Sequence, residues 1–336
     1  MEVQQNFTES LITTPNSPMR PPVSRANPRS APAQAPSDEL GVLLINVQEM
    51  IRVHDYKSAE QLLIRILFLD SCNLLALKWT YQIHLARKNF PQCLVIARNI
   101  QKIKYDFSSC LRMANLQYQL GNDQIALDSY FEALSVLGTE DVELFSIYKN
   151  IGNIYARFED FDGAEEYYNK AHTLNTNSDI LYVNFGTLAL QKNDVEKAKQ
   201  CFHRAIELNQ KNSQAWTGLG MIYHQQADFD LAWANVRQGF DFNHQNKIAL
   251  QLICQWSLHQ GKSDEAVICC LQYLDQNEFD KDVSGWLVEQ FAANQNFGSA
   301  LLETEKLRAF CPEMSPQLLN VVSHFEQQCE QRSQWI

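Results

Sequence analysis

A small side chain recurs along this chain at a nearly constant interval, from Ala59 to Ala300. Successive members are separated by 34, 33, 38, 34, 34, 34 and 34 residues. The column consists of Ala59, Cys93, Ala126, Ala164, Ala198, Ala232, Ala266 and Ala300. A fixed period of this length indicates a repeat architecture, in which each repeat is one supersecondary unit that buries its apolar face only by stacking on its neighbours.

Each repeat is predicted to contain two short helices. Turn-forming clusters lie between the apolar stretches, as at Gly121-Asn122-Asp123, Lys192-Asn193-Asp194 and Gly261-Lys262-Ser263. A second column lies four residues after the small one and is mostly larger: Leu63, Ala97, Tyr130, Tyr168, Phe202, Val236, Cys270 and Thr304. The small residues, together with Gly152, Gly186 and Gly220, are expected where two helices approach closely.

One repeat carries Trp216, Leu219, Gly220, Tyr223 and Ala232, which resemble the tetratricopeptide pattern W-x2-L-G-x2-Y…A-x3-F…P. Two others resemble it as well, with the series Tyr148-Ile151-Gly152-Tyr155-Ala164-Tyr168-Ala171 and Tyr182-Phe185-Gly186-Ala198-Phe202-Ala205. The resemblance implies an all-α fold, a right-handed superhelical solenoid of antiparallel helix pairs. It also implies a protein that binds other proteins or peptides and has no catalytic activity.

Three regions are predicted. Residues 1–38 contain seven prolines between Pro15 and Pro36 and are expected to be a disordered tail. Residues 39–314 are expected to hold eight repeats, starting near Leu40, Leu74, Phe107, Phe145, Asp179, Ser213, Lys247 and Lys281. Residues 315–336 are expected to form a capping helix, with Ser315-Pro316 at its start. Extra residues around 135–144 predict either a bend in the array or a tolerated loop insertion.

Composition excludes several classes of function. The net charge of −11 argues against a nucleic-acid-binding surface, and no apolar run is long enough for membrane insertion. The nine cysteines include no C-x-x-C pair, which favours free thiols in a reducing compartment and a cytoplasmic location. The eight histidines form no H-x-x-x-H or H-E-x-x-H pair, and no nucleotide-binding or nucleophile motif occurs. We therefore expect no catalytic residue, no metal site and no cofactor.

The predicted binding site is a polar stripe on the middle repeats. Lys149, Asn153 and Arg157 are four residues apart and share one helix face, and Asn150 lies beside them. Asn184 occupies the position of Asn150 one repeat later. The complete predicted set is Lys149, Asn150, Asn153, Arg157, Asn184, Gln214 and His224. The alternative is that these asparagines are ordinary exposed helix residues.

Two arrangements known in the resembling family are similar to this stripe. Lys149, Asn153 and Asn184 match three places of the clamp that holds a chaperone's C-terminal carboxylate, but Gln214 and Gly218 replace its remaining cations. Asn150 and Asn184 match two rungs of the asparagine ladder of the GlcNAc transferase. An amide side chain both donates and accepts hydrogen bonds, which suits the backbone of an extended peptide.

The flanking repeats carry apolar residues where an inner face is expected, namely Leu44, Leu75, Trp79, Leu252 and Trp286. They either accept an amphipathic helix of a partner, pack against a second copy of the chain, or belong to the ordinary core.

The leading hypothesis is an adaptor or scaffold that holds a protein or peptide partner in a concave groove. One alternative is a dedicated chaperone for a secreted or membrane client, which would need a more hydrophobic groove. Another is self-association, in which the N-terminal tail with Arg20, Arg25 and Arg29 occupies its own groove or a neighbour's.

Overall fold

The computed structural model describes residues 37–136, 143–311, 320, 323–325 and 327. The predicted tail, apart from its last two residues, lies outside the described residues. So do positions 137–142 of the expected insertion and most of the predicted capping helix.

The described chain is α-helical and contains no strand within these residues. It divides into two compact parts, one ending at Arg87 and one beginning at Lys88. The first part contains α1 (Ser37–Arg52), α2 (Tyr56–Leu69) and α3 (Leu74–Ala86). The second contains α4 (Phe90–Ile103), α5 (Phe107–Gln119), α6 (Asp123–Ser135), α7 (Leu144–Arg157), α8 (Phe161–Leu174), α9 (Asp179–Gln191), α10 (Val195–Leu208), α11 (Ser213–Gln225), α12 (Phe229–Phe242), α13 (Lys247–Gln260), α14 (Ser263–Leu274), α15 (Lys281–Ala293) and α16 (Phe297–Phe310).

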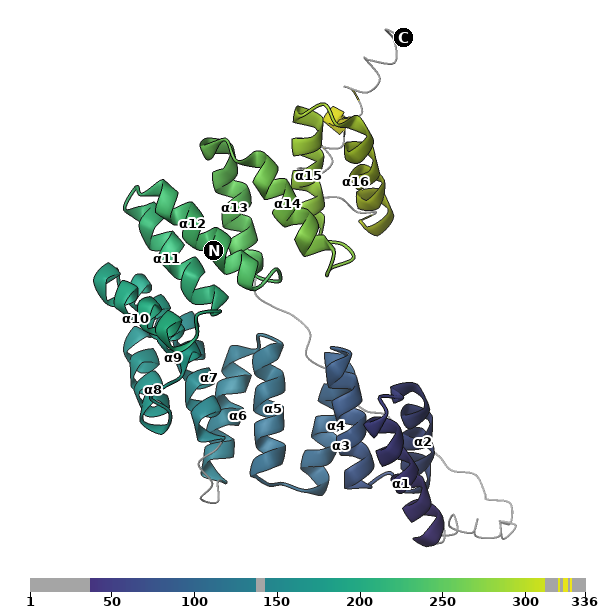
Figure 1. Cartoon of the computed structure of the whole chain (residues 1–336). Coiled ribbons are helices and arrows are strands. Elements are labelled where there is room, and N and C mark those ends of the chain that lie inside the picture. The colour runs from purple at the N-terminus through teal and green to yellow at the C-terminus, as the bar shows by residue number, and fades with distance from the viewer. Residues whose placement is uncertain (1–36, 137–142, 312–319, 321–322, 326, 328–336) are drawn as a thin grey trace, which may run out of the picture. The chain divides into compact units, whose positions relative to one another are not determined.

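Consecutive helices of the second part pack in pairs, as Figure 1 shows for α7 with α8 and for α11 with α12. The expected all-α solenoid of paired helices is therefore confirmed. None of the helices in the described residues has the length and apolarity to cross a membrane.

Short polar side chains start most of these helices. Asp160 accepts a hydrogen bond from the Gly163 N–H at 3.0 Å, and Asp194 accepts one from Lys197 at the same distance. Asn212 and Asn246 cap α11 and α13 in the same way. Each cap satisfies one of the N–H groups that the first helical turn leaves without an intrahelical partner, which fixes where the helix begins.

The turn inside each helix pair uses one residue in the left-handed conformation. These residues are His54, Lys88, Gly121, Glu159, Asn193, Ala227, Gly261 and Gln295, with φ between 56° and 73°. Only Gly121 and Gly261 are glycines, although glycine adopts this conformation most readily. The geometry of the repeat therefore overrides local preference at the other positions.

Close helix approach explains the central glycines. A Cβ atom on Gly152 would lie 2.5 Å from the Tyr168 ring, and one on Gly220 would lie 2.3 Å from Val236 Cγ2. Each pair joins the first and second helix of one repeat. The predicted glycine column thus lies where the two helices of a pair approach too closely for a larger side chain.

The cores lie between neighbouring helices. In the second part, for example, Phe202 and Ala205 of α10 pack with Leu219 and Ile222 of α11. Among the flanking apolar residues, Leu44 and Trp79 pack against the core of the first part. Leu252 and Trp286 pack against a core of the second. The core interpretation therefore holds for these four, whereas Leu75 is 44 % exposed.

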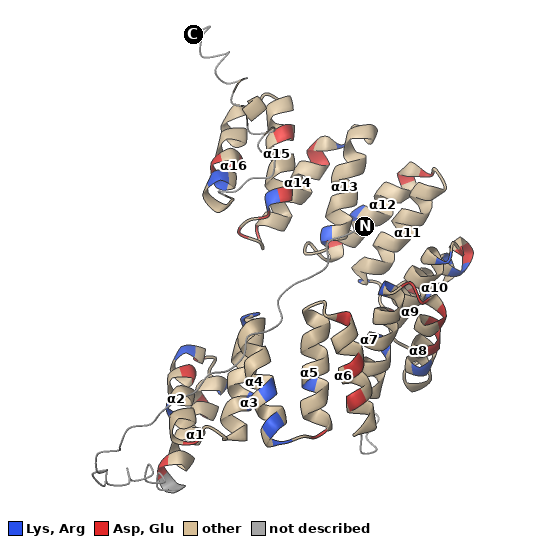
Figure 2. Ribbon diagram, turned by 180° about the vertical axis from the view of Figure 1, so that it is seen from behind, with Lys and Arg blue, Asp and Glu red and all other residues tan. Residues whose placement is uncertain are grey.

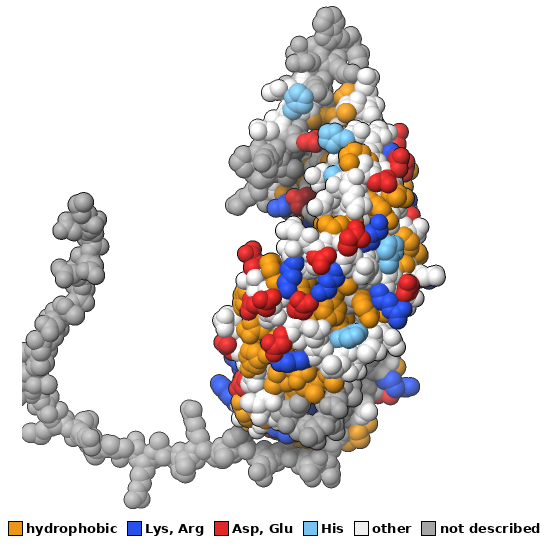
Figure 3. All heavy atoms as spheres, turned by 90° about the vertical axis from the view of Figure 1, so that its left-hand side faces the viewer, with side chains coloured by type: hydrophobic (Ala, Val, Ile, Leu, Met, Phe, Trp, Pro, Cys, Tyr) orange, Lys and Arg blue, Asp and Glu red, His pale blue; other side chains and the backbone are white. Residues whose placement is uncertain are grey.

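Positions with acidic and basic residues are spread over many of the helices and over the turns between them (Figure 2). Lys192 and Lys197 both pair with Glu165, at 2.7 and 2.8 Å. On the face seen in Figure 3, acidic and basic side chains are interspersed with apolar ones rather than segregated by sign. Such exposed pairs contribute little stability each, and this face offers no extended charged surface of one sign.

Candidate functional site

Two adjoining hollows lie along α7, α9 and α11. The first, of about 220 Å³, is lined by Asn153, Ala156, Arg157, Tyr168, Asn184, Thr187, Leu188 and Gln191. The second, of about 320 Å³, is lined by Val183, Asn184, Thr187, Leu190, Phe202, Gln214, Thr217, Gly218, Met221, Asn246 and Ile248. Both are lined by Asn184 and Thr187, so the two hollows adjoin at these residues, and we call them together the trough.

The polar end of the trough rests on a hydrogen-bonded network centred on Asn153. Its Oδ1 accepts from the Tyr168 hydroxyl and from Asn184 Nδ2, both at 2.8 Å. Its Nδ2 donates to the Tyr118 hydroxyl at 2.9 Å. The network joins α5, α7, α8 and α9, so the amide of Asn184 is held in place by side chains from several helices.

A related arrangement occurs one repeat earlier, where the second amide donates to the tyrosine hydroxyl and not to the amide oxygen. The Tyr130 hydroxyl donates to Asn115 Oδ1 at 2.7 Å and accepts from Asn150 Nδ2 at 2.9 Å. Burial raises the pKa of both Tyr130 and Tyr168, so each hydroxyl keeps its proton and can donate. Asn150 therefore joins α7 to α6, and it does not line either hollow of the trough.

Arg157 lies at the edge of the polar end and is paired with Asp123 of α6. Its Nε donates to Asp123 Oδ2 at 2.7 Å, and its guanidinium carbon lies 4.7 Å from the centre of the Tyr118 ring. The hydrogen bonds to Asp123 raise the pKa of Arg157 further, so it stays charged. Asp123 balances that charge, which leaves Arg157 a weaker carboxylate ligand than an unpaired arginine.

The other end of the trough is apolar because two polar residues of the repeat are replaced. Phe202 stands where Tyr168 stands one repeat earlier, and Gly218 stands where Asn184 stands. A Cβ atom on Gly218 would lie 2.5 Å from the Phe202 ring. The ring therefore fills the place of an amide side chain and forms part of the trough wall with Met221 and Ile248.

Gln214 and Asn246 supply polar groups to this apolar end. Gln214 is exposed on the first turn of α11. Asn246 Nδ2 donates to Ser213 Oγ at 2.7 Å and to Thr217 Oγ1 at 3.0 Å, while its Oδ1 caps α13. Asn246 is thus fixed, and Gln214 is the adaptable amide.

The trough gathers four of the seven predicted residues: Asn153, Arg157, Asn184 and Gln214. Lys149 is half-buried on α7 and lines neither hollow. His224 also lies outside both hollows, because its ring stacks on Trp256 with centroids 4.2 Å apart and meets Phe229 edge-on. Phe202, Met221 and Ile248 also line the trough and were not among the predicted site residues. The sequence signal for the apolar end is a double change between successive repeats, in which Phe202 replaces Tyr168 and Gly218 replaces Asn184.

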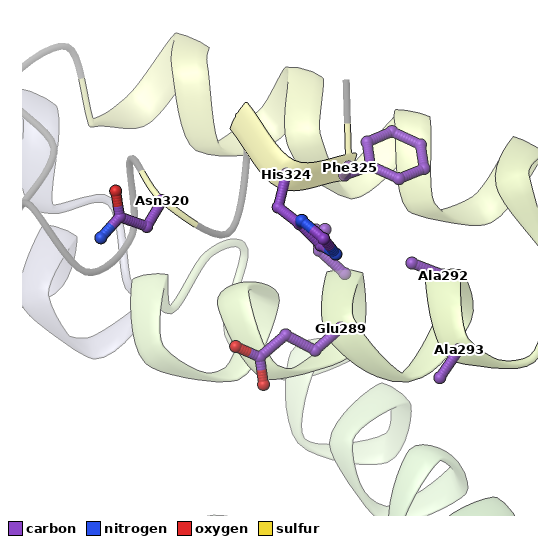
Figure 4. Close-up of a pocket in the computed structure, with 7 residues that line it drawn as sticks. Glu289, Ala292, Ala293, Asn320, His324 and Phe325 are labelled. Atoms are coloured by element: carbon purple, nitrogen blue, oxygen red, sulfur yellow. The ribbon is translucent and has the colours of Figure 1, made fainter. Parts of the chain in front are cut away.

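Another cavity, of about 440 Å³, lies near the C-terminus between α15 and residues that include His324 and Phe325 (Figure 4). Positions 321, 322 and 326, beside its lining residues, lie outside the described residues. The trough is the better-defined candidate site. Among the residues that the structure describes, no group of three or more His, Cys, Asp or Glu side chains could hold a metal ion.

Comparison with known proteins bears on the family and the fold. Residues 156–222 match the family model described as Tetratricopeptide repeat. Among solved structures, the chain is similar to the APC/C hetero-tetramer Cut9-Hcn1, with a TM-score of 0.53 and 15 % identity. That match covers 74 % of this chain and 48 % of the other, so this chain spans about half the length of its relative.

Two further structures are similar over less of this chain. PilW, a type IV pilus biogenesis factor, has a TM-score of 0.48 and 19 % identity, covering 64 % of this chain and 98 % of PilW. YrrB, a repeat protein with an unusual peptide-binding site, has a TM-score of 0.41 and 15 % identity, covering 56 % of this chain and 96 % of YrrB. No curated protein matches the sequence.

Proposed function

Because this chain is a tetratricopeptide-repeat protein, we propose that it is a non-catalytic adaptor that holds an extended segment of a partner protein along the trough. The repeat family consists in general of protein-interaction scaffolds, so binding is the expected class of function. The observation that supports this site is that a polar and an apolar hollow adjoin at Asn184, which lines both. An extended peptide that passes Asn184 can find hydrogen bonds in one hollow and apolar contacts in the other.

Asn184 is suited to bind a peptide backbone. Its Nδ2 is held by Asn153, which orients the amide, whereas its Oδ1 accepts no hydrogen bond from any described residue. That oxygen can accept from a peptide N–H without reorganisation of the side chain. A held acceptor loses little conformational entropy on binding, which favours affinity.

The apolar end favours a segment with an apolar side chain close to the backbone position held by Asn184. Met221 is 43 % exposed and Ile248 is 58 % exposed, so both can bury apolar surface against a ligand. A chaperone for a hydrophobic client would also use this end. The polar network around Asn153 fits an adaptor better, because it occupies the other half of the same trough. We propose a cytoplasmic location, which the scattered cysteines without a C-x-x-C pair favour.

The proposal is tested by selecting binders from a random peptide library with the full-length protein and measuring their affinity by fluorescence anisotropy. Asn184→Ala and Ile248→Asp are each expected to weaken binding about tenfold or more, since each removes a contact of about 1–2 kcal/mol. Asn169→Ala on the exposed face of α8 is the matched control and should leave affinity unchanged. Equal affinity for all four proteins would place the ligand elsewhere.

A further inference from the structure

Cys254 of α13 and Cys270 of α14 lie with their sulfur atoms 3.4 Å apart, and both are free thiols. The register of the repeat explains why they meet. Cys254 follows Gly220 by 34 residues and Cys270 follows Val236 by the same interval. Gly220 and Val236 lie where α11 and α12 approach closely, so the two cysteines occupy the equivalent positions of α13 and α14. These two helices lie side by side in Figure 1.

We propose that Cys254 and Cys270 form a redox modification site, at which a peroxide converts the two thiols into a disulfide that ties α13 to α14. A disulfide requires about 2.0 Å between the sulfur atoms, so they must approach by roughly a further 1.4 Å. The two helices already face each other at these positions. A small shift of two side chains and their helices is therefore sufficient.

The two cysteines differ in solvent exposure, and this difference indicates which of them reacts first with the oxidant. Cys254 is half-buried, whereas Cys270 is fully buried at 0 % exposure. The hydrogen bond with Cys254 and burial both raise the pKa of Cys270, so its thiol keeps its proton in the reduced protein. Cys254 is thus the sulfur that an oxidant reaches first, and Cys270 is the resolving thiol.

The reaction balances with hydrogen peroxide as the oxidant. The Cys254 thiolate attacks one peroxide oxygen, the O–O bond breaks, and Cys254 becomes a sulfenic acid while the leaving hydroxide is protonated to water. The Cys270 sulfur then attacks the Cys254 sulfur, the S–O bond breaks, and the departing hydroxide takes the Cys270 proton. Two thiols and one peroxide therefore give one disulfide and two waters.

Cys269, the sequence neighbour of Cys270, is held by a different group. Arg237 Nη1 donates to Cys269 Sγ at 2.8 Å, and Arg237 also pairs with Asp241 at 3.1 Å. Burial raises the pKa of Cys269 to about 11. This thiol is protonated and engaged with α12, which leaves Cys270 as the partner of Cys254.

The test treats the folded, reduced, full-length protein with hydrogen peroxide, blocks the remaining thiols and maps disulfides by mass spectrometry after non-reducing trypsin digestion. Cleavage at Lys247, Lys262 and Lys281 separates the cysteines into peptides 248–262 and 263–281. The expected product is these two peptides joined by a disulfide. Hydrogen exchange in α13 and α14 should slow about tenfold on oxidation, because the crosslink restricts local opening.

Matched variants identify the partners. The linked product should be lost in Cys254→Ala and in Cys270→Val, a change that places at position 270 the residue found at Val236. It should persist in Cys269→Ala and in Cys201→Ser, and circular dichroism will confirm that each variant is folded. Sulfinic acid at Cys254 without a crosslink would overturn the proposal. So would a crosslink that survives in Cys270→Val but disappears in Cys269→Ala.

Discussion

Asn184 of α9 donates a 2.8 Å hydrogen bond to the Oδ1 of Asn153 on α7, and the same oxygen accepts from the Tyr168 hydroxyl at 2.8 Å. One amide oxygen thus serves two donors from two different helices. Tyr168 is only 3 % exposed, so its hydroxyl has little access to water if that acceptor is removed.

Replacement of Asn153 by Leu is therefore expected to lower the free energy of unfolding by about 1–3 kcal/mol, because it leaves a buried hydroxyl without its partner. Urea unfolding followed by circular dichroism measures the change. Asn169→Ala, on an exposed position of α8, should change it by less than about 0.5 kcal/mol.

A double-mutant cycle tests the cause. Tyr168→Phe in the Asn153→Leu background removes the stranded hydroxyl, so the second change should cost less than it does in the wild type. The chain itself uses such a pairing one repeat later, where Phe202 packs without a hydroxyl and Thr187 replaces the asparagine. Strictly additive losses would contradict the proposed coupling.

The fold was predictable because its signals repeat. Six of the eight expected starts coincide with the first residue of a helix: Leu74, Phe107, Asp179, Ser213, Lys247 and Lys281. A capping residue precedes each of these starts, and the small-residue column recurs once in every repeat, so a boundary that is ambiguous in one repeat is fixed by the period of its neighbours. The left-handed residues Glu159 and Ala227 were not predictable, since neither residue type favours that conformation and the repeat geometry imposes it.

The candidate site was predictable only in part. Helical spacing placed Asn153 and Arg157 on one face, and the period placed Asn184 beside them. Spacing does not reveal that Arg157 is paired with Asp123 or that Asn150 is bonded to Tyr130, because these partners lie on other helices, 34 and 20 residues away. The stacking of the His224 ring on Trp256 was not predictable either, because Trp256 lies on another helix, α13.

A stabilising substitution is expected at Ala227, which has a φ of 61° in the turn between α11 and α12. Ala227→Gly should raise the free energy of unfolding by up to about 1 kcal/mol, because an L side chain is strained in this conformation.

The reverse change is available at the equivalent turn one repeat later. Gly261 has a φ of 65°, and nothing lies within 4 Å of the place where its Cβ would stand. Gly261→Ala should therefore destabilise by a similar amount through the backbone alone. Chemical denaturation of both variants compares them, and a shift of the same sign in each would contradict the conformational explanation.

Acid should weaken the C-terminal repeats through Asp280, which caps α15. Burial alone would raise the pKa of Asp280, but the 2.7 Å hydrogen bond from Lys247 and the N–H groups at the cap outweigh burial and hold this pKa below the usual value of an aspartate. The folded-state pKa is therefore the lower one. Its contribution is complete above the unfolded pKa of about 3.9 and is lost as pH falls through the folded value.

Unfolding measured at several pH values between about 6 and 2 checks this dependence. Asp280→Asn should lose part of the pH dependence below about pH 4 while keeping the cap, because asparagine caps helices about as well as aspartate. Asp162→Asn is the control, since the Asp162 side chain is 99 % exposed. An unchanged acid dependence in Asp280→Asn would rule out this carboxylate as a contributor.

The apolar end of the trough depends on the absence of a side chain at Gly218. Gly218→Ala should place a methyl group against the Phe202 ring, whose three nearest atoms lie at 2.5, 2.7 and 2.7 Å from the new Cβ position. Phe202 is 2 % exposed and cannot move without disturbing its neighbours. We expect a net loss of about 1–2 kcal/mol, since overpacking outweighs the better helix propensity of alanine. Phe202→Leu should reduce that loss by giving the methyl group room, whereas Gly298→Ala, where nothing lies within 4 Å, should cost nothing. If Gly218→Ala proves as harmless as Gly298→Ala in urea unfolding, the ring does not define this wall of the trough.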